Sequence, residues 1–141
     1  AHNNSCGVGR QQDWASHQME HELSAFYDCA HGAGLAVVMP AWMEYVMPHD
    51  PMRFARFAVE VFGCEMDYAH PQETALRGIA CLRNFFRSLD MPITFSQIGA
   101  RVEDIPAMDS PSAALFPSAP RKWRRSCILQ SGKPSGMFQH I

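Results

Sequence analysis

The apolar residues up to about residue 108 recur at helical spacing, and prolines and glycines divide them into separate segments. In the first segment, residues 12–29, one apolar stripe advances in steps of three or four: Ala15, Met19, Leu23, Phe26 and Ala30. Such steps keep side chains on one face of an α-helix, whereas a half-buried strand needs strict alternation. The spacing therefore predicts an all-α chain whose first helix covers this segment.

The segment that follows is rich in glycine and apolar residues. We expect Gly32 and Gly34 to break the first helix and to let another part of the backbone approach closely. Residues 35–45 then predict a second helix, buried on most sides and kinked by Pro40. The short apolar run LAVVM is also compatible with a strand, but the AWMEYV that follows it favours helix.

Two more helices carry clear boundary residues. Asp50 is expected to cap a helix that begins at Pro51 and ends at Gly63. The next helix begins at Pro71 and ends before Pro92. Shorter helical pieces are expected at residues 96–99 and from residue 102 onward. The apolar faces expected to pack are Phe54, Phe57, Ala58, Val61 and Phe62 in the first helix, and Leu76, Ile79, Leu82, Phe86 and Leu89 in the second.

Composition and charge exclude several classes of protein. The net charge of −2 gives no electrostatic attraction for nucleic acid or for an anionic membrane. No apolar run approaches the roughly 18 residues of a membrane-spanning helix. Charged residues make up 18% of the chain, against roughly 25% in a typical soluble domain, so we expect another structure to cover part of the surface. The five cysteines form no CxxC pair, which predicts reduced thiols in a cytoplasmic protein.

The character of the sequence changes at Asp109. Residues 109–141 contain scattered prolines and serines, a basic cluster at residues 121–125 and no apolar period. Such a segment is typical of a disordered or loosely attached tail. We therefore divide the chain into a partial helical domain, residues 1–108, and an irregular tail, residues 109–141.

Three histidines lie in the segment HQMEHELSAFYDCAHG, residues 17–32. His17 and His21 are one helical turn apart and, with Ser24 and Asp28, form a stripe nearly opposite the apolar one. His31 follows the expected break, where the chain folds back. This placement favours a polar site, and neutral imidazole suits zinc, iron, copper and nickel. Because paired histidines also occur by chance on exposed helix faces, the spacing alone leaves an incidental pair open.

The same residues fit a second pattern. His17 to His21 match H-x-x-E-H, the pattern of inverted zinc peptidases, with Glu20 as the general base. The pattern fixes only three positions and needs a further carboxylate ligand downstream, for which Glu73 and Glu103 are the candidates. A third hypothesis is a non-catalytic helical remnant whose histidines bind nothing.

The longer context is more specific than the spacing. The words DWASH, EHELSAFYD, AHGAGLAVV and PAWMEYV resemble the C-terminal half of iron-containing alcohol dehydrogenases, and within them the butanol dehydrogenase branch. Weaker similarity continues through PMRFARFAVEVFG and LDMPITFSQIGARVEDIP, so the resemblance covers residues 7–107. It implies the helical C-terminal domain of a two-domain fold of the dehydroquinate synthase type.

The resemblance also implies a site and an activity. It implies Fe²⁺ or Zn²⁺ held by one Asp and three His, two of which match His17 and His31. His21 matches a histidine that lies beside the metal and takes part in proton transfer. The metal acts as a Lewis acid on the alcohol oxygen while hydride passes between NAD(P)(H) and a small primary alcohol or aldehyde such as butanol or butanal. Members of the family are often homodimers.

This sequence departs from the family pattern in three places. It contains neither the upstream Asp and His ligands nor the glycine-rich phosphate loop of a nucleotide-binding domain. We therefore expect a piece of a longer oxidoreductase, inactive by itself, that needs the N-terminal domain to bind NAD(P)H. The residues after Asp109 also depart, and a shifted reading frame or a truncated gene product are two hypotheses for that change.

Overall fold

The computed structural model describes residues 14–104, and within this range it contains helices and no strand. The α-helices are α2 (Ala15–Tyr27), α3 (His31–Val46), α4 (Pro51–Phe62) and α5 (Pro71–Ser88). Three 3₁₀ helices complete the described part: η1 (Met47–His49), η2 (Phe95–Ile98) and η3 (Val102–Asp104). The prediction of an all-α chain is confirmed for these residues.

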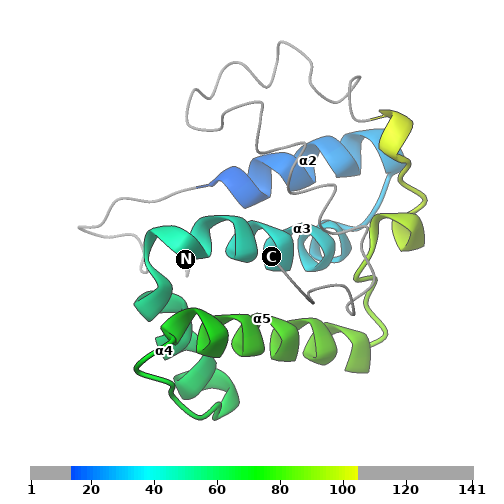
Figure 1. Cartoon of the computed structure of the whole chain (residues 1–141). Coiled ribbons are helices and arrows are strands. Elements are labelled where there is room, and N and C mark those ends of the chain that lie inside the picture. Colours follow the sequence, from blue (N-terminus) through cyan, green and yellow to red (C-terminus); the bar gives the residue numbers. More distant parts are fainter. Residues whose placement is uncertain (1–13, 105–141) are drawn as a thin grey trace, which may run out of the picture.

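The helices form a layered bundle in which α3 lies between α2 and α5 (Figure 1). Helix α4 packs against α5, and the segment after α5 returns past α3 to the end of α2 (Figure 1). The return is fixed by Tyr27 in α2, whose hydroxyl donates a 2.7 Å hydrogen bond to Asp104 Oδ2 in η3. None of the helices in the described range is long and apolar enough to cross a membrane.

Helix α4 has the predicted boundaries. Its N-cap is Asp50, whose Oδ1 accepts a 3.2 Å hydrogen bond from the backbone N–H of Arg53. Pro51 is the first residue, and Gly63 ends the helix in the left-handed conformation with φ of 66°. A side chain at position 63 would strain this backbone, so glycine provides the C-terminal stop.

The break between α2 and α3 lies earlier than predicted. Asp28, not glycine, ends α2 in the left-handed conformation with φ of 49°, and α3 already begins at His31. Gly32 and Gly34 are therefore inside the first turn of α3, and their predicted role as a helix break is wrong. Helix α3 also continues through the buried Pro40 as one element of 16 residues. The strand alternative for LAVVM is excluded.

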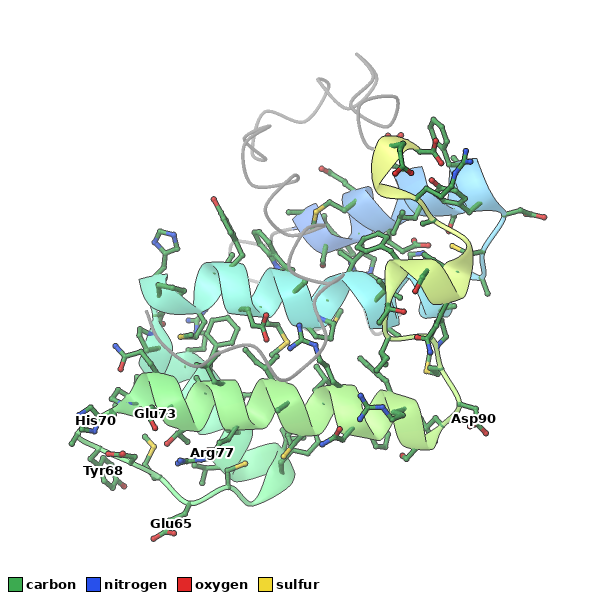
Figure 2. All side chains as sticks on the ribbon, turned by 45° about the vertical axis from the view of Figure 1, so that its right-hand side comes forward. Glu65, Tyr68, His70, Glu73, Arg77 and Asp90 are labelled. Carbon is green, nitrogen blue, oxygen red and sulfur yellow. The ribbon has the colours of Figure 1, made fainter. Side chains whose placement is uncertain are left out.

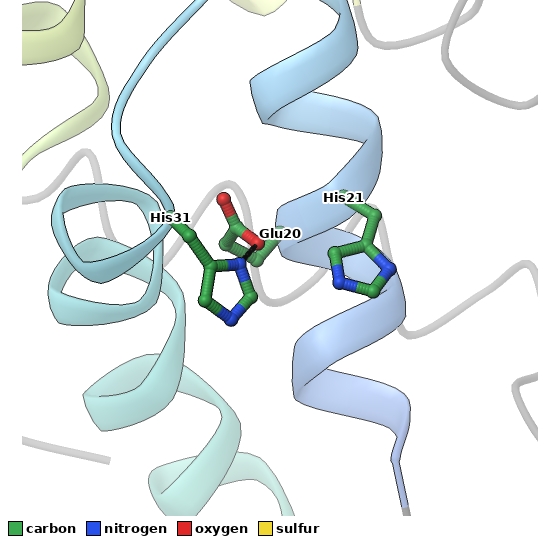
Figure 3. A group of neighbouring side chains, drawn as sticks. All are labelled: Glu20, His21 and His31. Carbon is green, nitrogen blue, oxygen red and sulfur yellow. Dashed lines mark ion pairs between the residues drawn. The ribbon is translucent and has the colours of Figure 1, made fainter.

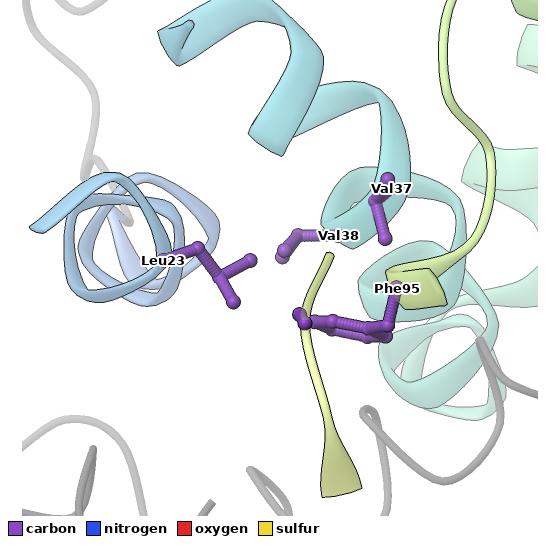
Figure 4. Close-up of a cluster of buried hydrophobic side chains, with 5 residues drawn as sticks. Leu23, Val37, Val38 and Phe95 are labelled. Carbon is purple, nitrogen blue, oxygen red and sulfur yellow. The ribbon is translucent and has the colours of Figure 1, made fainter. Parts of the chain in front are cut away.

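The core joins α2, α3 and η2. Leu23, Val37, Val38 and Phe95 meet between these elements, together with Ala100 (Figure 4). This cluster confirms the core role of Leu23, but two other residues of the predicted apolar stripe, Phe26 and Ala30, are exposed. Helix α2 instead buries Ser16 and Glu20, and Glu20 faces Gly34 of α3. The buried face of α2 thus combines Ala15 and Leu23 of the predicted apolar stripe with Ser16 and Glu20, which belong to neither predicted stripe.

Very small residues bring α4 and α5 close together. Ala55 and Ala58 in α4 and Ala75 and Gly78 in α5 are fully or almost fully buried. A Cβ atom built on Gly78 would lie 2.4 Å from the Cβ of Ala58. The helices therefore approach so closely that only hydrogen fits at position 78.

Candidate metal centre

The three histidines meet at the junction of α2 and α3. His17 and His21 lie on α2, and His31 is the first residue of α3. Only residues 28–30 separate the two helices, so α3 runs back along α2 and brings His31 beside the middle of that helix. The centroid of the His31 ring lies 5.4 Å from that of His17 and 5.3 Å from that of His21.

The potential ligand atoms form a tighter group that does not coincide with the predicted one. Ring or carboxylate atoms of Glu20, His21 and His31 all lie within 4.8 Å of one another (Figure 3). His17 is outside this group, although its ring neighbours His31 and makes an edge-on contact with Trp14, with a centroid separation of 5.1 Å. The structure thus brings the predicted residues together and adds Glu20 to them. The assignment of His17 and His31 as ligands stays a prediction.

Glu20 is the unexpected member of the group. Its side chain is completely buried, and the Ser24 hydroxyl donates a hydrogen bond to its Oε1. Its Oε2 makes an ion-pair contact with Nδ1 of His31 and has no hydrogen-bond partner among the described residues. A buried carboxylate oxygen without a hydrogen bond is costly, so this atom is a candidate contact for a cation or for an imidazole N–H.

From the sequence, Glu20 is predicted only as the base of a peptidase, because a charged residue inside a helix is ordinarily solvent-exposed. One further feature of the sequence could have pointed to its burial. Gly34 lies one turn into the next helix, where the absence of a side chain leaves room for another group to approach.

The peptidase hypothesis gains nothing from this geometry. Glu20 does point toward the histidines, but it has no exposed surface from which to reach the attacking water that a general base must contact. Glu73 lies at the start of α5 near His70 and Tyr68, and the 18 residues of that helix separate its ends by about 27 Å (Figure 2). The start of α3 neighbours the opposite end of α5, since a Cβ on Gly32 would lie 3.9 Å from Met91 Cε. Glu103, in η3, is exposed and outside the ligand group.

Two residues near the cluster have other tasks. Asp28 is the exposed C-cap of α2. Tyr27 holds η3, and its burial, together with its hydrogen bond to Asp104, raises the pKa of its hydroxyl. The same hydrogen bond, followed by those from Arg101, lowers the pKa of the Asp104 carboxyl. These contacts link η3 to the C-terminal end of α2.

Comparison with protein families gives an extended match. Residues 4–131 match the C-terminal region of the Fe-containing alcohol dehydrogenase family. The match runs past Asp109 into the segment that composition separates from the helical domain. That boundary lies outside the described residues and stays a prediction.

Individual relatives point the same way. The chain is 37% identical over 98 residues to NADH-dependent butanol dehydrogenase A of Clostridium acetobutylicum, which covers 69% of this chain and 25% of that protein. It is 32% identical over 106 residues to the NADPH-dependent aldehyde reductase YqhD of Escherichia coli, which covers 75% of this chain and 27% of that protein. The chain therefore spans about a quarter of the length of these relatives.

A solved structure shares the fold. The crystal structure of NADH-dependent butanol dehydrogenase A from Thermotoga maritima superposes with a TM-score of 0.82 at 34% sequence identity. The superposition covers 93% of this chain and 36% of that one.

Proposed function

The chain belongs to the Fe-containing alcohol dehydrogenase family, and from that premise we propose that it provides half of a divalent-metal site to an alcohol–aldehyde oxidoreductase. The parent protein would interconvert small primary alcohols and aldehydes with NAD(P)(H), as its relatives' names indicate for those proteins. The observation that carries the proposal is the convergence of His17, His21 and His31 at the α2–α3 junction.

The donor set fits a borderline metal ion. Imidazole and carboxylate are ligands for iron and zinc. In the described part, donor atoms of Glu20, His21 and His31 lie within 4.8 Å of one another, and the His17 ring lies 5.4 Å from that of His31. His17 and His31 are the proposed ligands, with the remaining ligands and the nicotinamide cofactor supplied by the N-terminal part of the protein. A bound divalent ion would supply Lewis-acid stabilisation of the alcohol oxygen.

The residues of this chain would handle the proton and the approach of the substrate. His21 is exposed, so its imidazole is reachable from solvent and can pass the proton of the alcohol to water. Its ring lies next to the ring of His31, which is one of the proposed ligands, so the proton relay would lie directly beside the metal site. No disulfide joins the cysteines of the described residues, Cys29, Cys64 and Cys81. Free thiols support a reducing compartment such as the cytoplasm.

Zn²⁺ titration of the purified chain by calorimetry tests the proposal. We expect binding that is weak compared with a four-ligand site, because each absent ligand removes both a bond and preorganisation. His17→Ala and His31→Ala should each remove it. His49→Ala is the matched control, because His49 follows the opposite end of α3. Binding that survives both substitutions would contradict the proposal and favour a helical remnant that binds no metal through these residues.

Activity provides a second test. The 141 residues contain no glycine-rich phosphate loop, so we expect the purified chain alone not to reduce butanal with NADH or NADPH. Nicotinamide-dependent reduction of butanal by this chain would show that its residues bind the cofactor in another way.

A further inference from the structure

We propose that Glu20 is a positioning residue for His31: its buried carboxylate accepts a hydrogen bond from Nδ1–H of His31 and thereby directs Nε2 of that ring to the metal. The inference rests on the proposed function, because His31 is the proposed ligand that Glu20 would orient.

The complete burial of Glu20 is the first observation that supports this role. The side chain is completely buried on the α3-facing side of α2, where a carboxylate needs compensating partners. Ser24 satisfies Oε1 through its hydroxyl. In the described part of the chain, the group that faces Oε2 is Nδ1 of His31. The compensation of this oxygen therefore depends on a proton at Nδ1.

The second observation is that Gly34 has no side chain, which leaves the space that the Glu20 carboxylate fills. A Cβ atom at position 34 would lie 2.7 Å from both Cγ and Oε1 of Glu20, which is closer than such atoms approach in proteins. Helix α3 thus holds the carboxylate from one side, while Ser24 holds it from its own helix. The direction of the Glu20 side chain is set by both helices.

The chemistry of imidazole explains how a carboxylate at Nδ1 would direct Nε2 of His31 to a metal. A neutral imidazole carries one N–H, so a proton on Nδ1 leaves the lone pair on Nε2. Metal-binding histidines commonly donate their other ring N–H to a carboxylate, which fixes the tautomer and the ring orientation. Figure 3 shows the ion pair between the Glu20 carboxylate and Nδ1 of His31, with the ring of His21 beside them. The geometry favours an orienting role over direct ligation, because one carboxylate oxygen faces Ser24 and the other faces the imidazole.

Nitrogen NMR of the metal-free chain, labelled with ¹⁵N-histidine, tests the tautomer without any metal. We expect His31 in the Nδ1–H form in the parent chain, and a shift toward the Nε2–H form in Glu20→Met, which keeps the volume of the side chain but removes the acceptor. Glu22→Gln, on the same helix and outside the ligand group, should leave the His31 signals unchanged. A parent chain with His31 in the Nε2–H form would overturn the proposal.

Zn²⁺ affinity and thermal unfolding separate positioning from a purely structural role. Glu20→Met should weaken Zn²⁺ binding about 10- to 100-fold, the usual effect of losing such a carboxylate partner. Gly34→Ala should act in the same direction, because its methyl group displaces the carboxylate while both histidines remain.

The unfolding midpoint should stay near that of the parent chain in Glu20→Met. In the variant the Ser24 hydroxyl can donate its proton to the Cys29 carbonyl oxygen, 3.1 Å away, and the His31 side chain, 48% exposed, can bind water. A lower midpoint with unchanged Zn²⁺ affinity would show that Glu20 serves only the fold. A parent chain that binds no Zn²⁺ would refute the proposed function, while the NMR result would still decide whether Glu20 sets the tautomer of His31.

Discussion

At the residue scale, polar groups in this chain are placed by their partners more than by their position on a helix. Glu20 is buried because Ser24 and His31 contact its carboxylate and Gly34 leaves room for it. Its neighbours in the sequence, Met19 and His21, are both more exposed. The α3–α5 contact shows the same principle, since Arg83 and Glu44 form an ion pair whose side chains are only 22% and 15% exposed. Truncating one partner of such a pair leaves the other charge without compensation.

Cys64 allows a test of local environment at the same scale. Burial, followed by the neighbouring thiol of Cys81, raises the pKa of Cys64. Because the thiolate is the reactive form, we expect alkylation of Cys64 by iodoacetamide to reach half its maximum rate at a higher pH than in the urea-unfolded chain. Peptide mapping by mass spectrometry across pH measures both curves. Coinciding midpoints would show that the folded environment does not protect the protonated thiol.

At the scale of helices, the close approach of two backbones determines how α4 and α5 pack against each other. These two helices form the most extensive contact between elements in residues 14–104. Ala58 and Ile79 of the predicted faces are fully buried, and the unpredicted Ala55, Ala75 and Gly78 are buried with them. Val61, Leu76 and Leu89 belong to the predicted faces and are 60%, 44% and 55% exposed. The small residues let the two helices approach closely, as the short distance between Gly78 and Ala58 shows.

Gly78→Ala tests this interface. The added methyl group would overlap Ala58, so the helices must move apart, and we expect a loss of about 1–3 kcal/mol in the free energy of unfolding. Gly32→Ala is the matched control, because its Cβ would make only an ordinary contact with Met91 at 3.9 Å. Urea unfolding followed by circular dichroism measures both. Equal stabilities of the two variants would contradict the close approach.

The attachment of η3 to α2 should depend on pH in a defined sense. The pKa of Asp104 is lowered, so its contribution is present above the unfolded value of about 3.9 and is lost as the pH falls through the lower folded value. The pKa of Tyr27 is raised, so its contribution is present below about 10 and is lost as the pH rises through the higher folded value.

The backbone N–H of Arg101 donates a 3.3 Å hydrogen bond to the Tyr27 hydroxyl and reports on this contact. We expect its NMR signal to change below about pH 4 and above about pH 10 but to stay constant between them. Asp104→Asn should remove the acid change, and Tyr27→Phe the alkaline one. A transition of the parent chain near neutrality would show that other groups control the contact.

At the scale of the whole molecule, the chain presents apolar surface that its own described helices do not cover. Phe85 and Leu89 lie four residues apart at the end of α5, and their side chains are 50% and 55% exposed. Trp14, at the start of α2, is 43% exposed. The chain also spans only about a quarter of the length of its relatives. Exposed apolar patches of this kind favour association with other surfaces.

We therefore expect the purified chain to self-associate as its concentration rises. Phe85→Ser combined with Leu89→Ser should reduce this association without lowering the unfolding midpoint, because neither side chain belongs to the buried core. Sedimentation velocity over a range of concentrations measures the effect, with Asn84→Ser, also exposed on α5, as the control. Association that is the same in all three chains would place the responsible surface elsewhere.

The helices, most of their boundaries and the family could all be predicted from the amino-acid sequence. Periodicity and the N-cap Asp50, the first-turn prolines Pro51 and Pro71 and the stop at Gly63 are local properties, and local interactions decide where a helix begins and ends. The words around His17, His21 and His31 sufficed to identify the family, which the match over residues 4–131 confirms.

The buried side of each helix and the way the histidines meet depend on how the helices pack together. The reversal at Asp28 turns α3 back along α2, buries Glu20 against Gly34 and sets its carboxylate on His31. That placement arises from contacts between residues that are 11 to 14 positions apart in the sequence and belong to different helices. The helical repeat of one segment carries no information about its partner, because burial is a property of the pair of surfaces in contact.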